Sequence, residues 1–341
     1  MNSPNGSPLL EVKNLKKYFE IGAGLFSKSE SIRAVDGVDF TLDKGEAISL
    51  VGESGSGKTT LGLTVLRLHE PNEGQIKIRG RDITHLDQKS LMWYRRETGL
   101  IQQDPFGALP SFFTIQRILE EPLIIHKMGD RGERRNRVHE ALEKVRLTPI
   151  EDFAQKYPHM LSGGQLQRVA IARALILDPE LVIADEPVSM LDASVRIEIL
   201  NLLQELQNQL DISFIYITHN LALTKYFSER LFIMYAGKIV EAGDIKEVIN
   251  RPLHPYTEAL MKAIPDPDPE NRKRIRDIPK GEPPNLVNPP SGCRFHPRCP
   301  YAMDICKNEP PMESREGGGY ALCWLYESGG SLESVPESSG L

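Results

Sequence analysis

The sequence lacks any uninterrupted apolar run close to the ~18 residues of a membrane-spanning helix. Its first residues, MNSPNGSP, also lack the apolar segment of a secretory signal, so we expect a cytosolic protein that reaches membranes only through a partner. Basic residues are not in excess: the net charge of −6 argues against nucleic acid and anionic lipid as partners. The 341 residues, 40% hydrophobic and 26% charged, are enough for about two globular domains.

Cysteine is scarce, and all of it lies near the end of the chain. The four cysteines are Cys293, Cys299, Cys306 and Cys323. In a reducing compartment, clustered thiols favour a metal over disulfides. Their spacing differs from the tight pairs of common zinc ribbons and bacterial ferredoxins, and a set of thiolates suits zinc and an iron–sulfur cluster equally. The residues alone leave zinc, an iron–sulfur cluster and unligated thiols open.

The stretch GESGSGKTT matches the phosphate-loop pattern GxxxxGK[ST]. Residues 47–51 before it are an apolar run and the residues after it show apolar periodicity, which predicts a strand, a glycine loop and a helix. We expect Lys58 to contact the β- and γ-phosphates and the Thr59 hydroxyl to bind Mg²⁺. The predicted nucleotide-binding residues of this loop are Gly52, Glu53, Ser54, Gly55, Ser56, Gly57, Lys58, Thr59 and Thr60.

A second predicted anion site lies in residues 161–168, LSGGQLQR, at the start of a helix rich in small residues. Ser162 can cap this helix, while Gly163 and Gly164 leave its first N–H groups accessible. Gln165 completes the segment. The N-terminus of a helix attracts anions, so the chain is predicted to carry two phosphate-binding helix ends.

Carboxylates follow a strand that is predicted to be buried. Residues 181–184 are continuously apolar, as in a parallel strand covered on both faces, and Asp185 and Glu186 come next. We expect Asp185 in the Mg²⁺ shell and Glu186 as the base that polarises the attacking water. His219 ends another predicted strand and can hydrogen-bond the γ-phosphate, although a structural histidine is more common there. Gln103, at the end of a third strand, is placed to meet a metal or a water.

Two aromatic groups allow two interpretations each. Tyr18 and Phe19 precede the phosphate-binding unit, so Phe19 either stacks on an adenine ring or belongs to the core. The segment Phe106–Phe113 places three phenylalanines in a loop broken by glycine and proline. It is either buried under neighbouring helices or exposed for a partner.

Together these motifs resemble the ATP-binding subunits of ABC transporters over about residues 9–248. The motifs that carry the resemblance are GESGSGKTT, Gln103, LSGGQLQR, LVIADEP, the segment Ser189–Asp192 and His219. The resemblance implies a P-loop NTPase α/β core with an antiparallel β subdomain and an α-helical insert subdomain. It also implies that Phe19 stacks the adenine and that Asp192 belongs to the nucleotide site.

The resemblance further implies that two such subunits face each other head to tail, with each ATP between them. From one chain it implies contributions by Lys58, Thr59, Gln103, Asp185, Glu186 and His219. From the other chain it implies the loop Ser162–Gln165. In this arrangement Glu186, His219 and Gln103 are catalytic, and Thr59, Gln103 and Asp185 hold Mg²⁺.

The C-terminal part resembles the dipeptide/oligopeptide importer branch of this family. The segments NRPLHPYTEAL (250–260) and PPSGCRFHPRCP (289–300) carry this resemblance. It implies that the small, irregular extension binds a structural [4Fe–4S] cluster through its cysteines, with zinc as the alternative. Asn220, where an aspartate commonly follows the histidine, departs from the family pattern without removing a catalytic group.

The expected function is ATP hydrolysis that drives a membrane permease for uptake of di- and oligopeptides. The alternatives are an importer of oligosaccharide or nickel, and a soluble ABC ATPase outside transport. Implied partners are a second, related but different ATPase subunit, two transmembrane permease subunits and an extracytoplasmic solute-binding protein, with no nucleic acid. We expect a peripheral protein on the cytoplasmic face of the membrane. The predicted domains are 1–250 with a helical insert at about 104–178, the extension 251–327, and a disordered tail 328–341.

Overall fold

The computed structural model describes residues 7–22, 30–264, 281–311, 313–316 and 319–326. The predicted disordered tail, 328–341, lies outside the described residues. The chain divides into two compact units, which we describe separately. The first gathers Thr41–Ala47 and Lys77–Ile217 with the described part of Met1–Glu11, and the second gathers Val12–Phe40, Ile48–Ile76 and the described part of Thr218–Leu341.

Parallel strands form the centre of the first unit. These strands are β6 (Thr98–Ile101), β7 (Leu181–Asp185) and β8 (Ser213–Thr218), and β7 pairs with both of the others. Every residue of β7 is buried, as expected for a strand covered on both faces. Because the strands run in parallel, Asp185 at the end of β7 lies at the edge where α/β proteins bind ligands.

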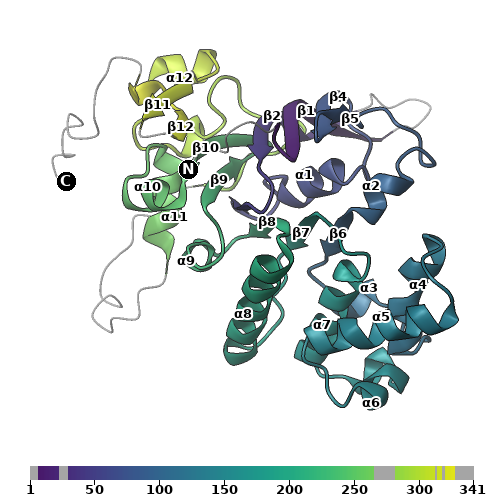
Figure 1. Ribbon diagram of the computed structural model, residues 1–341. Coiled ribbons are helices and arrows are strands. Elements are labelled where there is room, and N and C mark those ends of the chain that lie inside the picture. The colour runs from purple at the N-terminus through teal and green to yellow at the C-terminus, as the bar shows by residue number, and fades with distance from the viewer. Residues whose placement is uncertain (1–6, 23–29, 265–280, 312, 317–318, 327–341) are drawn as a thin grey trace. The chain divides into compact units, whose positions relative to one another are not determined.

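Helices occupy the region of the predicted insert. They are α3 (Pro105–Ala108), α4 (Ile115–Ile125), α5 (Arg131–Lys144), α6 (Ile150–Gln155), the 3₁₀ turn η1 (Pro158–Met160) and α7 (Gly163–Leu175). Figure 1 shows α3 to α7 gathered in one cluster. Ile115, Ile118 and Leu119 of α4 are fully buried, at the spacing of one apolar helix face. The first unit also contains the hairpin strand β5 (Arg81–Asp82), α2 (Met92–Arg96) and α8 (Ala193–Leu210).

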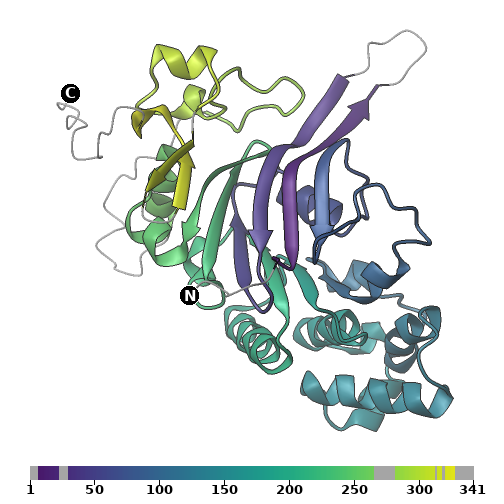
Figure 2. The ribbon, with the colours of Figure 1, turned by 45° about the horizontal axis from the view of Figure 1, so that its top comes forward.

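In the second unit, long strands precede the phosphate loop. The strands β2 (Glu30–Leu42), β1 (Leu10–Ile21) and β4 (Glu73–Ile78) are neighbours in that order. Figure 2 shows β1 and β2 side by side. β1 carries Tyr18 and Phe19 close to its end at Ile21.

The rest of the second unit is built around β3 (Ala47–Val51) and β9 (Arg230–Tyr235), which pair in parallel. β10 (Lys238–Asp244) pairs antiparallel with β9, and β12 (Gly319–Leu322) pairs antiparallel with β10 and with β11 (Glu313–Glu316). The C-terminal extension therefore adds strands to this sheet. The helices of the unit are α1 (Lys58–Val65), α9 (Leu221–Thr224), α10 (Ile245–Asn250), α11 (Pro255–Ala263), α12 (Asp304–Asn308), η3 (His296–Arg298) and η4 (Trp324–Tyr326).

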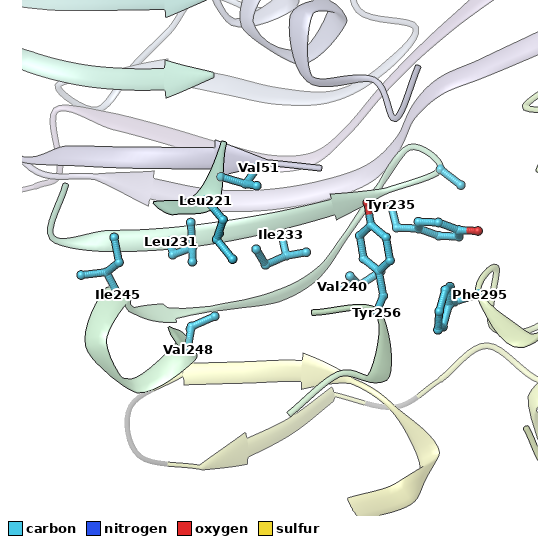
Figure 3. Packing of buried hydrophobic residues seen from close by; sticks show 11 residues of the cluster. Val51, Leu221, Leu231, Ile233, Tyr235, Val240, Ile245, Val248, Tyr256 and Phe295 are labelled. Atoms are coloured by element: carbon cyan, nitrogen blue, oxygen red, sulfur yellow. The ribbon is translucent and has the colours of Figure 1, made fainter. Parts of the chain in front are cut away.

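An aromatic cluster joins the extension to β9 (Figure 3). The ring of Tyr235 lies 4.5 Å from that of Tyr256 on α11 and 5.2 Å from that of Phe295, centroid to centroid. All three side chains are fully buried, and Cys293 and Cys299 pack against the same cluster. Burial of such rings stabilises the contact by roughly 2 kcal/mol each. The cysteine-containing segment thus shares a core with the nucleotide-binding part of its unit.

A buried carboxylate holds the start of α11. Glu241 on β10 accepts hydrogen bonds from the backbone N–H groups of Leu253 and His254, each at 2.8 Å. Burial raises the pKa of this carboxyl group. Among the helices that the structure describes, none has both the length and the apolar composition needed to cross a bilayer.

Candidate nucleotide-binding site

The phosphate loop connects β3 to α1 and has no room for side chains at two of its glycines. Gly57 has a left-handed φ of 106°, and a Cβ atom there would lie 2.0 Å from the carbonyl oxygen of Ala34. A Cβ atom at Gly52 would lie 2.1 Å from the carbonyl oxygen of Met234. Only glycine fits either position, so the neighbouring backbone fixes the shape of the loop.

Lys58 reaches back into this loop. Its Nζ donates hydrogen bonds of 2.8 Å to the carbonyl oxygens of Gly52 and Glu53, and the side chain is only 6% exposed. None of the described side chains caps the start of α1. The loop thus presents a buried ammonium group beside an uncapped helix N-terminus, which is the electrostatic environment that a polyphosphate requires.

The candidate adenine contact, Phe19, is half-buried on β1 and stands outside the hydrophobic core. The His69 ring meets it edge-on at 5.4 Å, and Lys17 Nζ lies 4.9 Å from its centroid. The neighbouring Tyr18 instead donates its hydroxyl proton to Asp36 Oδ1 at 2.5 Å. Burial, followed by the hydrogen bond to Asp36, raises the pKa of Tyr18. The Tyr18 hydroxyl is therefore hydrogen-bonded to a carboxylate, whereas the ring of Phe19 stays partly accessible.

In the first unit, Glu186 follows buried Asp185 with an unusual backbone conformation. Its φ is 45°, a left-handed value that costs a non-glycine residue roughly 1–2 kcal/mol. The Glu186 N–H donates to the Ile217 carbonyl oxygen at 2.8 Å, and the Ser189 hydroxyl donates to the Glu186 carbonyl oxygen at 3.1 Å. Such strain, held by surrounding hydrogen bonds, is typical of functional positions.

Two predicted site residues meet in this unit. Gln103 Nε2 donates a hydrogen bond of 3.2 Å to Glu186 Oε2, although the two lie far apart in the sequence. Gln103 is exposed. The amide therefore orients the carboxylate that is predicted to act as the base.

His219, in the second unit, is exposed at the end of β8. The next residue, Asn220, accepts a hydrogen bond from Ala222 N–H and caps α9. An aspartate would serve the same capping role, so this departure from the family pattern does not alter the local fold.

The predicted cap at the start of α7 is confirmed. Ser162 Oγ accepts from Gln165 N–H at 3.4 Å, and Gln165 Oε1 accepts from Ser162 N–H at 3.1 Å. This reciprocal pair is a capping box. Asp192, another predicted site residue, is exposed immediately before α8.

The aromatic loop after Gln103 is partly exposed. Phe106 and Phe112 are 59% and 73% exposed, whereas Leu109 between them is buried. Of the two interpretations from the sequence, the structure favours exposure for these two rings. Exposed aromatic side chains at this density are typical of a protein–protein contact.

All four cysteines are free thiols. Burial raises the pKa of Cys299 to about 11 and that of Cys323 to about 12, and the other cysteines of the segment add to both shifts. The backbone N–H of Cys293 donates to the carbonyl oxygen of Cys306 at 2.8 Å, so these two residues are adjacent. No set of three or more His, Cys, Asp or Glu side chains in the described ranges is arranged as a metal site.

Two arginines of the extension reach the nucleotide-binding part of the second unit, and sequence reasoning did not assign them a role. Arg294 pairs with Asp36, and Arg298 pairs with Glu53 of the phosphate loop. The feature of the sequence that could have indicated a role is their position next to Cys293 and Cys299 in SGCRFHPRC.

Family models match two parts of the chain. Residues 35–189 match the model described as ABC transporter. Residues 240–306 match the model described as oligopeptide/dipeptide transporter, C-terminal region. The phosphate loop and Glu186 fall in the first match, and Arg294 and Arg298 fall in the second.

Similar proteins cover nearly the whole chain. The oligopeptide transport ATP-binding protein AppF of Bacillus subtilis is 44% identical over 330 residues, which are 96% of this chain and 100% of AppF. The dipeptide transport ATP-binding protein DppF of Haemophilus influenzae is 41% identical over 319 residues, 93% of this chain and 97% of DppF.

Solved structures share the fold. The ATP-binding cassette MJ0796, in a dimeric post-hydrolysis state bound to ADP and Pi, aligns with a TM-score of 0.62 at 32% identity, covering 69% of this chain and 98% of that one. CbiO1 of Clostridium perfringens, part of the transporter complex cbiONQ, aligns with a TM-score of 0.61 at 29% identity, covering 72% and 91%.

Proposed function

The chain belongs to the ATP-binding proteins of ABC transporters, in the oligopeptide/dipeptide branch, and from that membership we propose how its residues work. The protein is an ATPase subunit that energises the uptake of di- and oligopeptides through a membrane permease. The observation that carries this function is the combination, in one chain, of an ABC ATPase core with the C-terminal region of peptide importers.

We assign binding of the triphosphate to the phosphate loop. Lys58 neutralises charge on the β- and γ-phosphates, and its burial in the loop supports this role because electrostatic attraction strengthens away from water. The Thr59 hydroxyl, Gln103 and Asp185 are the proposed ligands of Mg²⁺, which offsets phosphate charge when it is bound. Phe19 is proposed to stack on the adenine ring.

Hydrolysis is assigned to Glu186, which takes a proton from the attacking water. The Gln103 amide orients this carboxylate, and His219 is proposed to hydrogen-bond the γ-phosphate. In a head-to-tail dimer, a second ATPase subunit contributes its own loop, equivalent to Ser162–Gln165. Asp192 is proposed to border the nucleotide. Support for a dimeric arrangement comes from the related cassette, which is a dimer bound to ADP and Pi.

The proposed partners are a second, related but different ATPase subunit, two permease subunits and an extracytoplasmic solute-binding protein. The exposed rings of Phe106 and Phe112 support a permease contact at this loop. We propose that the protein is a peripheral subunit on the cytoplasmic face of the membrane. We also propose the domain limits 1–250 and 251–327, with the helical insert at about 104–178.

We further propose that the four cysteines bind a [4Fe–4S] cluster rather than zinc. The support is that Cys293 and Cys299 pack against one cluster and that the Cys293 N–H donates to the Cys306 carbonyl oxygen at 2.8 Å. Protein purified without oxygen should show visible absorption and bound iron, and Cys306→Ser should lose both. Stoichiometric zinc without iron would favour the alternative metal.

The decisive test of the function is Glu186→Gln. This substitution keeps the shape of the side chain but removes the base, so we expect ATP hydrolysis to fall roughly 100-fold or more. Together with the second ATPase subunit, the variant should still form ATP-bound dimers on size-exclusion chromatography. Glu205→Gln, which removes an exposed carboxylate paired with Arg146, is the matched control and should leave turnover unchanged. Undiminished turnover in Glu186→Gln would falsify the assignment of the base.

A further inference from the structure

The C-terminal extension holds the phosphate loop through Arg298. Its two terminal nitrogens donate to Glu53, with Nη1–Oε2 at 2.8 Å and Nη2–Oε1 at 3.1 Å. The arginine side chain is 8% exposed, and Nη1 also donates to the Tyr235 hydroxyl at 3.3 Å. The Glu53 side chain is 29% exposed, so the pair is shielded from water mainly on its arginine side. Its two-pronged, charge-assisted geometry fixes both distance and orientation.

A second group of the extension holds the backbone of the same loop residue. The N–H of Glu53 donates to the hydroxyl oxygen of Tyr256 on α11 at 2.9 Å, and Tyr256 is fully buried. The carbonyl oxygen of Glu53 accepts from Lys58 Nζ. The extension thus holds both the side chain and the backbone N–H of Glu53. The carbonyl group of the same residue contacts Lys58, which is assigned to the phosphates.

A parallel set of contacts reaches the strand that carries Phe19. Arg294 donates to the carboxylate of Asp36 and to the carbonyl oxygen of Ala236. Asp36 in turn accepts the hydroxyl proton of Tyr18, the neighbour of Phe19. Arg294 follows Cys293 and Arg298 precedes Cys299 directly in the sequence, so the same cysteine-containing segment supplies both contacts.

We propose that the C-terminal extension is a positioning device for the nucleotide site, with Arg298 as the positioning residue of the phosphate loop. The inference rests on the proposed ATPase function and adds a role for a segment outside the nucleotide motifs. Arg298 acts through the side chain of Glu53, a residue of the predicted nucleotide-binding loop. It holds the loop in the shape that a triphosphate needs, and thereby lowers the ordering cost of binding.

Nucleotide affinity in the full-length chain tests this role. For Arg298→Ala, the Kd of Mg-ATP by titration calorimetry should rise roughly 5- to 30-fold. The kcat of the assembly with the second ATPase subunit, at saturating ATP, should stay within about twofold of the wild type, because lost positioning weakens ground state and transition state alike. Arg298→Lys keeps the charge without the two-pronged geometry and should restore part of the affinity. Lys307→Ala, which removes an exposed ion pair with Asp304 in the same extension, should bind ATP normally.

Two further measurements guard against a folding defect. Tyr256→Phe deletes only the hydroxyl that accepts from Glu53 N–H and should weaken ATP binding in the same direction, by roughly two- to fivefold. Arg298→Ala should add nothing to the Kd in a Glu53→Ala background, since the partner is already absent. An unchanged Kd in both Arg298→Ala and Tyr256→Phe overturns the inference. A wild-type chain that fails to bind ATP would instead overturn the proposed function.

Discussion

The phosphate loop and the start of α7 are both glycine-containing helix N-termini, yet they are built in opposite ways. At the phosphate loop, none of the described side chains caps α1, and the cation of Lys58 lies inside the loop. At α7, Ser162 and Gln165 cap each other. A capping box satisfies part of the N–H groups that a helix start leaves without intrahelical partners. The first end is open to a ligand, and the second is partly satisfied by its own residues.

The contrast between the two helix starts indicates which of them supplies most of the free energy of ATP binding. At the uncapped start of α1, the first N–H groups have no side-chain cap and remain available to phosphate. Together with the buried ammonium group they favour strong phosphate binding. The capped start of α7 leaves mainly the N–H groups of Gly163 and Gly164 for a nucleotide on another subunit. We therefore expect ATP affinity to depend on the loop, whereas the α7 end contributes after two subunits meet.

The largest effect should come from Lys58→Ala. It removes the cation assigned to the phosphates, so Mg-ATP binding to the full-length chain should weaken roughly 100-fold, or about 3 kcal/mol. Titration calorimetry measures the change. Gln165→Ala at the other helix end should leave this affinity nearly unchanged in the monomeric state. Equal losses in the two variants would contradict the difference between the ends.

A smaller effect is expected from glycine-to-alanine substitutions, which should destabilise the phosphate loop but not the start of α7. At Gly57 a Cβ atom would lie 2.0 Å from the carbonyl oxygen of Ala34, so Gly57→Ala should lower the free energy of unfolding by roughly 2–3 kcal/mol. At Gly163 a Cβ atom would meet Leu191 Cδ2 at an ordinary 3.6 Å. Gly163→Ala should therefore be neutral or slightly stabilising in urea unfolding. Comparable destabilisation of both variants would show that the α7 end is as tightly enclosed as the loop.

Local motifs allowed much of this molecule to be predicted from the sequence. The phosphate loop, the cap at Ser162 and the buried strand before Asp185 each depend on a few consecutive residues and on simple periodicity. These motifs then carried the family resemblance, which implied the fold class. The fold class is confirmed by solved structures at 32% and 29% identity.

Contacts between distant segments could not be predicted. The pair of Arg298 and Glu53 joins residues 245 positions apart, and no periodicity or motif links them. The left-handed conformation of Glu186 depends on hydrogen bonds from Ser189 and to Ile217, which only the assembled strands bring together. Similarly, composition left the exposure of Phe106 undecided, because a loop with aromatic residues can be buried or exposed.

The smallest effect should come from Ser162→Ala. The substitution removes the hydroxyl that accepts from Gln165 N–H, and loss of such a cap lowers the free energy of unfolding by about 1 kcal/mol. Ser162→Thr keeps an oxygen in the same place and should recover most of that loss in urea unfolding. Neither variant should change ATP affinity of the monomer, because the loop of the same chain is intact. Weaker ATP binding by monomeric Ser162→Ala would mean that the α7 end contributes to the first binding step, and the two helix ends would then differ in structure without differing in role.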